Sequence, residues 1–179
     1  MLTATNIYIR PLTLNDAPEL LHIEEKNKAL FDLYSPTRPE NYLTLERQQE
    51  LITRWEENAT NDKEYRFGIF LLENDRLIGT IGLFQVTRFI RECAIFGYSL
   101  DEDYHGKGYT TEAAKLVVDF AFNTLHLHRL EAGVMPVNVG SIRVLEKAGF
   151  HNEGLAHKNI KINGKWEDHY SFAIVNPND

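Results

Sequence analysis

The sequence predicts a mixed α/β fold in which helices cover both faces of one central sheet. Apolar and β-branched runs separated by short turns, over 65–87 and again over 150–175, predict antiparallel hairpins at the front and the back of the sheet. Between them, strand and helix alternate over 93–137, which predicts βαβ crossovers. The helix expected over 109–124 is apolar around a wide arc, which is typical of a helix packed against a sheet.

The N-terminal third is expected to hold one strand and two helices. Alternating apolar residues over 6–10 predict a short strand. Asn15 is expected to cap a helix over 16–30, with Pro18 in its first turn, where a missing N–H costs little. Apolar residues that recur at helical spacing predict a second helix over 41–58.

The middle of the chain is expected to hold three strands and the long helix. Runs rich in aromatic and β-branched residues predict strands over 65–72 and 76–87, joined by a turn at 73–75. A third apolar run, over 93–100, predicts a buried strand. A polar turn follows it, and the long helix over 109–124 begins directly after that turn.

The C-terminal part completes the order βααβββαβαββ. A strand is expected over 129–137 and a short helix over 139–148, which ends with Gly149 in the left-handed cap position. The last two strands are joined by Asn163 and Gly164, and Asn-Gly is the strongest short signal of a hairpin.

Composition and charge narrow the class of protein. With 179 residues, 43% of them hydrophobic, the chain is expected to form a single domain over 1–179. Its 19 Lys and Arg against 26 Asp and Glu give a net charge of -7, which argues against a nucleic-acid or anionic-membrane binder. The single cysteine, Cys93, excludes a disulfide framework and a cysteine-based zinc cluster, and no metal site is expected. The chain shows no apolar run as long as a membrane span and no signal-peptide pattern, so a cytoplasmic location is expected.

The segment richest in chemistry joins a buried strand to the long helix. Gly106 and Gly108 lie in the polar turn, where the absence of a side chain lets backbone N–H groups point outward. The helix N-terminus adds unpaired donors and a partial positive charge, so the two features together predict an anion cradle suited to a pyrophosphate. Lys107 adds a cation, and Thr110 and Thr111 add hydroxyl donors.

The spacing by itself leaves a second interpretation open, a plain glycine turn before a helix. Two familiar phosphate motifs fit less well. In a Walker A loop the lysine follows the last glycine, whereas Lys107 precedes Gly108. A dinucleotide fingerprint needs a third glycine where this chain has Thr111.

A second motif lies downstream, over 138–150, and the two motifs together resemble the GCN5-related N-acetyltransferase (GNAT) superfamily. The closest resemblance is to the branch that acetylates the N-termini of ribosomal proteins, and it extends over nearly the whole chain. The matching residues are Gly97, Tyr98, Leu100, Asp101, Gly106, Gly108, Tyr109, Glu112, Ala113, Asn138, Ser141, Lys147, Gly149 and Phe150. The resemblance implies the GNAT fold, a mixed, mostly antiparallel sheet of about seven strands. In that fold the sheet splays in the middle, where pantetheine lies, and helices cover both faces.

The resemblance also implies acetyl-CoA as the cofactor and assigns residues to it. Those expected to contact it are Ser99, Leu100, His105, Gly106, Lys107, Gly108, Tyr109, Thr110, Thr111, Asn138, Ser141 and Lys147. The family usually carries Gln or Arg where this chain has His105, and Gly or Ala where it has Thr110. Because backbone N–H groups do most of the phosphate binding, the cradle is expected to tolerate both changes.

Two catalytic positions depart from the family's pattern. Many relatives have a tyrosine that protonates the leaving thiolate; its equivalent here is Leu145, and in the ribosomal branch Ser141 is the usual substitute. The glutamate that the branch often carries in the central strand is Ile95 here. Glu92, at the start of that strand, is the candidate base, with Glu131 in the next strand as an alternative. The opposing interpretation makes Glu92 a solvated edge charge.

The reaction implied by the resemblance is direct attack of an amine on the thioester of acetyl-CoA. An α-amino group, with a pKa of about 7.7–8.0, needs less help from a base than a lysine of about 10.4. The scarcity of acids near the site therefore favours the N-terminal α-amine of a protein, ribosomal proteins included. Two alternatives stay open: a small amine such as a polyamine or an antibiotic, and a non-catalytic acyl-CoA-binding module. No nucleic-acid or membrane partner is expected, and the sequence leaves monomer and homodimer open.

Overall fold

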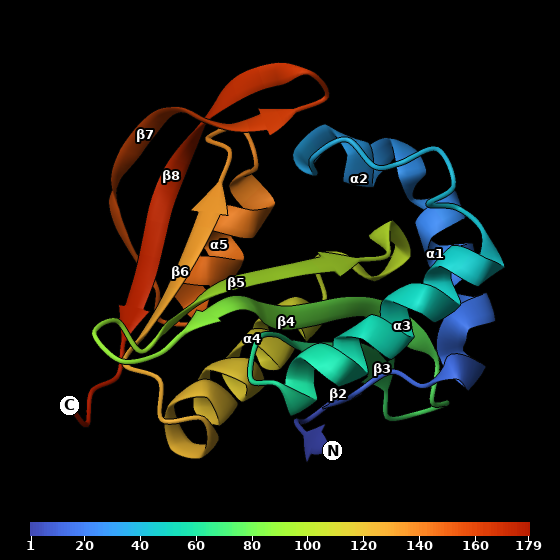
Figure 1. Cartoon of the computed structure of the whole chain (residues 1–179), viewed down its shortest axis with the longest axis horizontal. Coiled ribbons are helices and arrows are strands. Elements are labelled where there is room, and N and C mark those ends of the chain that lie inside the picture. Colours follow the sequence, from blue (N-terminus) through green and yellow to red (C-terminus); the bar gives the residue numbers. More distant parts are fainter.

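A computed structural model describes residues 1–179 and shows one open sheet of eight strands with helices on both faces, which confirms the predicted fold class (Figure 1). The strand order is β1-β2-β3-β4-β5-β6-β8-β7, and all neighbours are antiparallel except β5 and β6. The strands are β1 (Leu2–Thr3), β2 (Ile7–Arg10), β3 (Tyr65–Leu71), β4 (Leu77–Thr87), β5 (Cys93–Leu100), β6 (Arg129–Val134), β7 (His151–Ile162) and β8 (Lys165–Val175). The helices are α1 (Ala17–Lys26), α2 (Lys28–Tyr34), α3 (Leu45–Thr60), α4 (Tyr109–Asp119) and α5 (Val139–Lys147).

The two faces of the sheet are covered by different helices because side chains alternate along each strand. Ile7 and Ile9 of β2 belong to the larger core, which they share with buried residues of α4 and α5. Tyr8, between them, belongs to a smaller core with α1, α2 and α3. None of these helices combines the length and apolar character that crossing a bilayer requires.

The sheet opens in its middle, between the only two parallel neighbours. Strands β5 and β6 are paired at three positions, the last of which joins Ile95 to Glu131. Beyond this point β5 continues to Leu100 and β6 to Val134 without pairing to each other, and Figure 1 shows the two strands pointing in different directions. The splayed sheet expected from the family resemblance is therefore present.

Four features of the N-terminal half differ from the sequence prediction, and three of them concern where strands and helices begin. The two-residue strand β1 is an eighth strand that the pattern did not reveal. Asn15 is not the N-cap of α1; Asp16 holds that position without a side-chain bond to the helix, and its carboxylate accepts from the Thr13 N–H (2.7 Å) and pairs with Arg10. The following helix begins at Leu45 instead of residue 41, because the Thr44 hydroxyl caps it by accepting from the Arg47 N–H.

The helix predicted over 16–30 is broken into α1 and α2 at Asn27. This residue is buried, and its side-chain amide donates to the Ile23 carbonyl (2.9 Å) while its oxygen accepts from the Glu102 N–H (3.0 Å). A tertiary contact thus overrides the helical spacing at this residue.

The later elements follow the prediction with small shifts in their ends. The long helix changes to a π-helical turn over Phe120–Thr124, and β6 ends at Val134 instead of residue 137. Gly149 has φ +99°, as expected of a left-handed cap. The β7–β8 hairpin turns at Asn163 and Gly164, and the Asn163 side chain donates to the Asp32 carbonyl of α2. The hairpin and α2 therefore meet across one end of the sheet (Figure 1).

Candidate active site

The opening in the sheet leads into a cavity of about 820 Å³. One wall is the part of β5 that is not paired with β6, from Phe96 to Leu100, and the facing wall runs from Ala132 in β6 to Met135 just after that strand. The turn before α4 and the first turn of α5 border one part of the cavity, and residues of α1, α2 and α3 border the other. One cavity thus connects the predicted cradle with the face of the sheet that the N-terminal helices cover.

The turn before α4 has the backbone conformation that an anion cradle needs. Gly106 and Gly108 have φ values of +74° and +82°, and a Cβ atom built on either would meet no atom within 4 Å. Their outward side is therefore open space at the N-terminus of α4, where backbone N–H groups have no intrahelical partner. Thr110, buried in the first turn, lines the same cavity. These residues fit a pyrophosphate.

The turn is held in place by α1. Lys26 Nζ lies 2.8 and 2.9 Å from the two carboxylate oxygens of the buried Asp101, and Asn27 accepts from the Glu102 N–H. Burial raises the pKa of Asp101, but its bonds to Lys26 and to the Asp103 N–H keep the pKa below its usual value. The His105 ring closes the turn, because its Nε2 donates to the Leu100 carbonyl at 3.0 Å.

The first turn of α5 presents a hydroxyl pair to the cavity. Asn138 caps the helix by accepting from the Ser141 N–H (3.2 Å), which orients the serine. The Ser141 Oγ lies 2.7 Å from the phenol oxygen of Tyr98 on β5. Burial raises the pKa of Tyr98 to about 12, against a smaller opposing effect of the Ser141 bond. The phenol therefore stays protonated at neutral pH and can give a proton through the serine.

Leu145, which stands where many relatives have tyrosine, is buried one turn further along α5 and lines the cavity. Tyr98 was not among the predicted catalytic residues, although the sequence motif contained it. The signal that would have identified it is its place within the motif, one residue before Ser99 in the part of β5 that is not paired with β6.

The other half of the cavity is lined by aromatic and charged groups from the N-terminal helices and neighbouring strands. The guanidinium carbon of Arg66 lies 4.9 Å from the Trp55 ring centre and 4.1 Å from that of Phe84. Glu24, which is 5% exposed, forms an ion pair with Arg38. Burial raises the pKa of Glu24, although Arg38 opposes this effect. Glu24 is the only carboxylate that lines the cavity.

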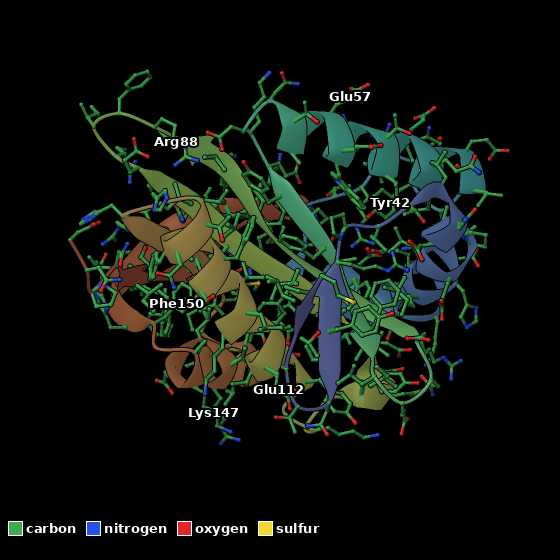
Figure 2. All side chains as sticks on the ribbon, turned by 90° about the horizontal axis from the view of Figure 1, so that it is seen from below. Tyr42, Glu57, Arg88, Glu112, Lys147 and Phe150 are labelled. Atoms are coloured by element: carbon green, nitrogen blue, oxygen red, sulfur yellow. The ribbon has the colours of Figure 1, made fainter.

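The structure brings together seven of the residues that the sequence assigned to acetyl-CoA. Those that line the cavity are Ser99, Leu100, His105, Gly106, Thr110, Asn138 and Ser141. Those that do not line it are Lys107, Gly108, Tyr109, Thr111 and Lys147. Lys107 instead lies 5.3 Å from the centre of the Tyr104 ring, and Lys147 sits in the last turn of α5 and points to solvent (Figure 2).

Glu92, the predicted base, does not reach the cavity. It precedes β5, whereas the part of β5 that lines the cavity begins at Phe96, four positions further on and about 13 Å away along an extended strand. Its carboxylate accepts from Arg88 (3.0 Å) and from the Phe89 N–H (2.8 Å). Figure 2 shows Arg88 well away from Tyr42, which lines the cavity. The geometry favours the interpretation of Glu92 as an edge charge.

Glu131, the alternative base, is also engaged elsewhere. It forms ion pairs with Arg91 and Arg129, both at 2.8 Å, at the point where β5 and β6 part. Neither acid that the sequence offered as a base therefore faces the cavity.

A comparison with protein families matches residues 6–151 to the profile described as acetyltransferase (GNAT) domain. Among curated proteins, the probable N-acetyltransferase YjcK of Bacillus subtilis (strain 168) is 54% identical over 179 residues, which cover 100% of this chain and 99% of that protein. The ribosomal protein uS5-alanine N-acetyltransferase of Escherichia coli (strain K12) is 28% identical over 176 residues, covering 98% of this chain and 91% of that protein.

Solved structures show the same similarity. The ribosomal-protein-S5-alanine acetyltransferase of Vibrio fischeri superposes with a TM-score of 0.92 at 29% identity, covering 98% of this chain and 96% of that one. RimJ of Mycobacterium smegmatis, solved in complex with CoA-disulfide, superposes with a TM-score of 0.89 at 26% identity, covering 94% of this chain and 81% of that one.

Proposed function

Because this chain belongs to the GNAT acetyltransferase family and uses acetyl-CoA to acetylate an amine, we propose that its acceptor is the α-amino group of a protein N-terminus. The uS5-alanine N-acetyltransferase of E. coli, similar over almost the whole chain, makes ribosomal proteins the first acceptors to test. Acetylation of a ribosomal protein would place the reaction in the cytoplasm.

The observation that carries this proposal is the charge of the half of the cavity that the N-terminal helices line, which we take to bind the acceptor amine. Its one carboxylate, Glu24, is paired with Arg38, and Arg66 adds a second positive charge. A polyamine or an aminoglycoside carries several positive charges and needs several carboxylates to bind in such a space. An α-amine carries one charge and loses it near pH 8, so it is the amine class that this lining tolerates.

Acetyl-CoA supplies the acetyl group as a thioester. We assign its pyrophosphate to the backbone N–H groups at Gly106 and Gly108 and its pantetheine arm to the opening between β5 and β6. Asn138 and Ser141 then border the sulfur end of the arm. Two observations support this assignment. The space outside both glycines is open, and one cavity is lined by residues of the turn, of β5 and of the first turn of α5.

Tyr98 and Ser141 act on the leaving side of the reaction. In this proposal Ser141 gives its proton to the departing thiolate and recovers one from Tyr98, whose raised pKa keeps it protonated. The hydrogen bond between the two oxygens is the path for that transfer.

The test is acetylation of a matched set of amines, followed by mass spectrometry. Peptides that begin with Ala, Ser or Met are compared with the same peptides blocked at the N-terminus but carrying a lysine, and with spermidine and an aminoglycoside. We expect acetylation of the free N-termini and a kcat/KM at least tenfold lower for the other amines. Preferred acetylation of spermidine or the aminoglycoside would refute the proposed acceptor.

A further inference from the structure

One buried titratable side chain of the cavity has no role in the chemistry described so far. His169 lies on β8, is 3% exposed and lines the cavity. Its Nδ1 is 3.1 Å from the backbone carbonyl oxygen of Glu167. A carbonyl oxygen only accepts, so Nδ1 carries the hydrogen of the neutral ring. The other nitrogen, Nε2, therefore has a free electron pair and can take up a proton.

The His169 ring lies beside the opening in the sheet. A Cβ atom built on Gly133 would be 3.7 Å from the ring's Cδ2, the carbon bonded to Nε2. Gly133 is two residues beyond Glu131, where the pairing of β5 with β6 ends. The edge of the ring that carries Nε2 thus adjoins the part of β6 that is not paired with β5.

His169 and the hydroxyl pair lie on opposite faces of the sheet. Ala132 and Val134 of β6 belong to the core with α4 and α5, so Gly133, which alternates with them, faces the other way. Tyr98 packs against that same core and bonds to Ser141 of α5. A proton acceptor therefore borders one face of the opening and a proton donor the other, as an acyl transfer between them requires.

We propose that His169 is the general base that deprotonates the acceptor amine. This inference rests on the acetyltransferase reaction, whichever amine is the acceptor. Nε2 takes one proton from the ammonium group, and the freed amine nitrogen forms a C–N bond to the acetyl carbon while the C–S bond breaks. Of the other two amine protons, one stays on the amide and one is released to water as the amide forms, while the Tyr98–Ser141 pair regains from water the proton that it gave to the thiolate. His169 then releases its proton to water.

The charged groups around His169 leave its ring free for this role. On the same face of β8, Glu167 is paired with Lys165 at 3.1 Å. On β6, Glu131 is paired with two arginines. From α2, which contacts β7, Asp32 is paired with Lys28. None of these acids is hydrogen-bonded to the ring.

The first experiment compares His169→Gln with His151→Gln, a matched change at an exposed histidine on β7 that bonds only to Glu153. For His169→Gln we expect kcat to fall roughly 100-fold, because a glutamine side chain cannot accept the proton. The KM for acetyl-CoA and the rise in melting temperature with acetyl-CoA should stay as in the wild type. His151→Gln should keep kcat within twofold. A kcat within threefold of wild type in His169→Gln, or loss of the acetyl-CoA-induced rise, would overturn the proposal.

A second measurement needs no variant. In the wild-type protein labelled with ¹⁵N-histidine, NMR shifts should show the neutral ring of His169 as the tautomer with its hydrogen on Nδ1. A proton on Nε2 instead would overturn the proposal even if His169→Gln does not fold. If the enzyme acetylates a small amine and no peptide, the proposed acceptor fails, and the same comparison of His169→Gln with wild type on that amine still decides the role of His169.

Discussion

Replacing Gly106 with alanine tests whether the turn before α4 holds the phosphates of acetyl-CoA. Gly106 has φ +74° and faces open space, so an added Cβ strains the backbone without striking a neighbour. Gly164, in the β7–β8 turn, has φ +81° and also faces open space, but it lies outside the cavity. Gly164→Ala is therefore a matched control with the same backbone cost and no effect on the cradle.

The expected losses of stability and of acetyl-CoA affinity follow from the positive φ of both glycines and from the place of Gly106 alone in the cavity. An L-residue in the left-handed region costs about 1–2 kcal/mol, so each variant should lose roughly 2–8 °C of melting temperature. The alanine Cβ would occupy the open space assigned to the phosphate, and displacing the phosphate from one charged hydrogen bond at the cradle costs a further 1.5–3 kcal/mol of binding, roughly a 10- to 150-fold weaker affinity. At acetyl-CoA a hundred times the wild-type Kd, the stabilisation should fall from about 2.7 kcal/mol to about 0.3–1.4 kcal/mol in Gly106→Ala only.

The assay is thermal unfolding with and without acetyl-CoA. Wild type and Gly164→Ala should rise equally on adding acetyl-CoA, by roughly 5–10 °C, whereas Gly106→Ala should show at most about half of that rise. An equal rise in all three proteins would show that the phosphates are not held at this turn.

Three further predictions concern the site and its supports. Ser141→Ala and Tyr98→Phe should each lower kcat roughly 10- to 100-fold while keeping the acetyl-CoA-induced rise in melting temperature; a steady-state assay that finds either unchanged contradicts the proton path. The pKa of Asp101 is lower in the folded protein than in the unfolded chain, where it is about 3.9, so its carboxylate stabilises the fold at pH values above the unfolded pKa. This stabilisation is lost as pH falls through the folded pKa, so Asp101→Asn should be less stable than wild type at pH 7. Urea unfolding at stepped pH should show that difference shrinking below about pH 4, and a constant difference would contradict it. Arg38→Met leaves the buried Glu24 carboxylate unpaired and should cost about 3–5 kcal/mol of unfolding free energy, most of which Glu24→Gln in the same chain should restore; denaturation curves in which the double variant is no more stable than Arg38→Met would refute this.

Local signals in the sequence predicted the features that depend on neighbouring residues. The positive φ of Gly149 and the turn at Asn163 and Gly164 follow from the conformations that these residues favour. Most strands and helices also lie where the apolar periodicity placed them, with ends shifted by a few residues. The conformational preferences of neighbouring residues are sufficient to predict such features.

Features that depend on distant partners were not predictable in the same way. Asn27 breaks a helix because its side chain bonds to Glu102, 75 residues away. Tyr98 meets Ser141 across 43 residues, and no local pattern indicates that contact. Glu92 was assigned by its residue type and its place at the start of the central strand; a stricter use of the strand's direction would have placed it at the wrong end of β5.

The three-pair seam between β5 and β6 bears on how the molecule unfolds. One half of the sheet contains β1 to β5 and the other contains β6, β8 and β7, and few strand-to-strand hydrogen bonds join them. Amides that border the seam should therefore exchange with solvent through local opening at a lower free energy than those of the central strands β3 and β4. A ligand that contacts both halves opposes that opening, so filling the gap also makes the two halves unfold as a single cooperative unit.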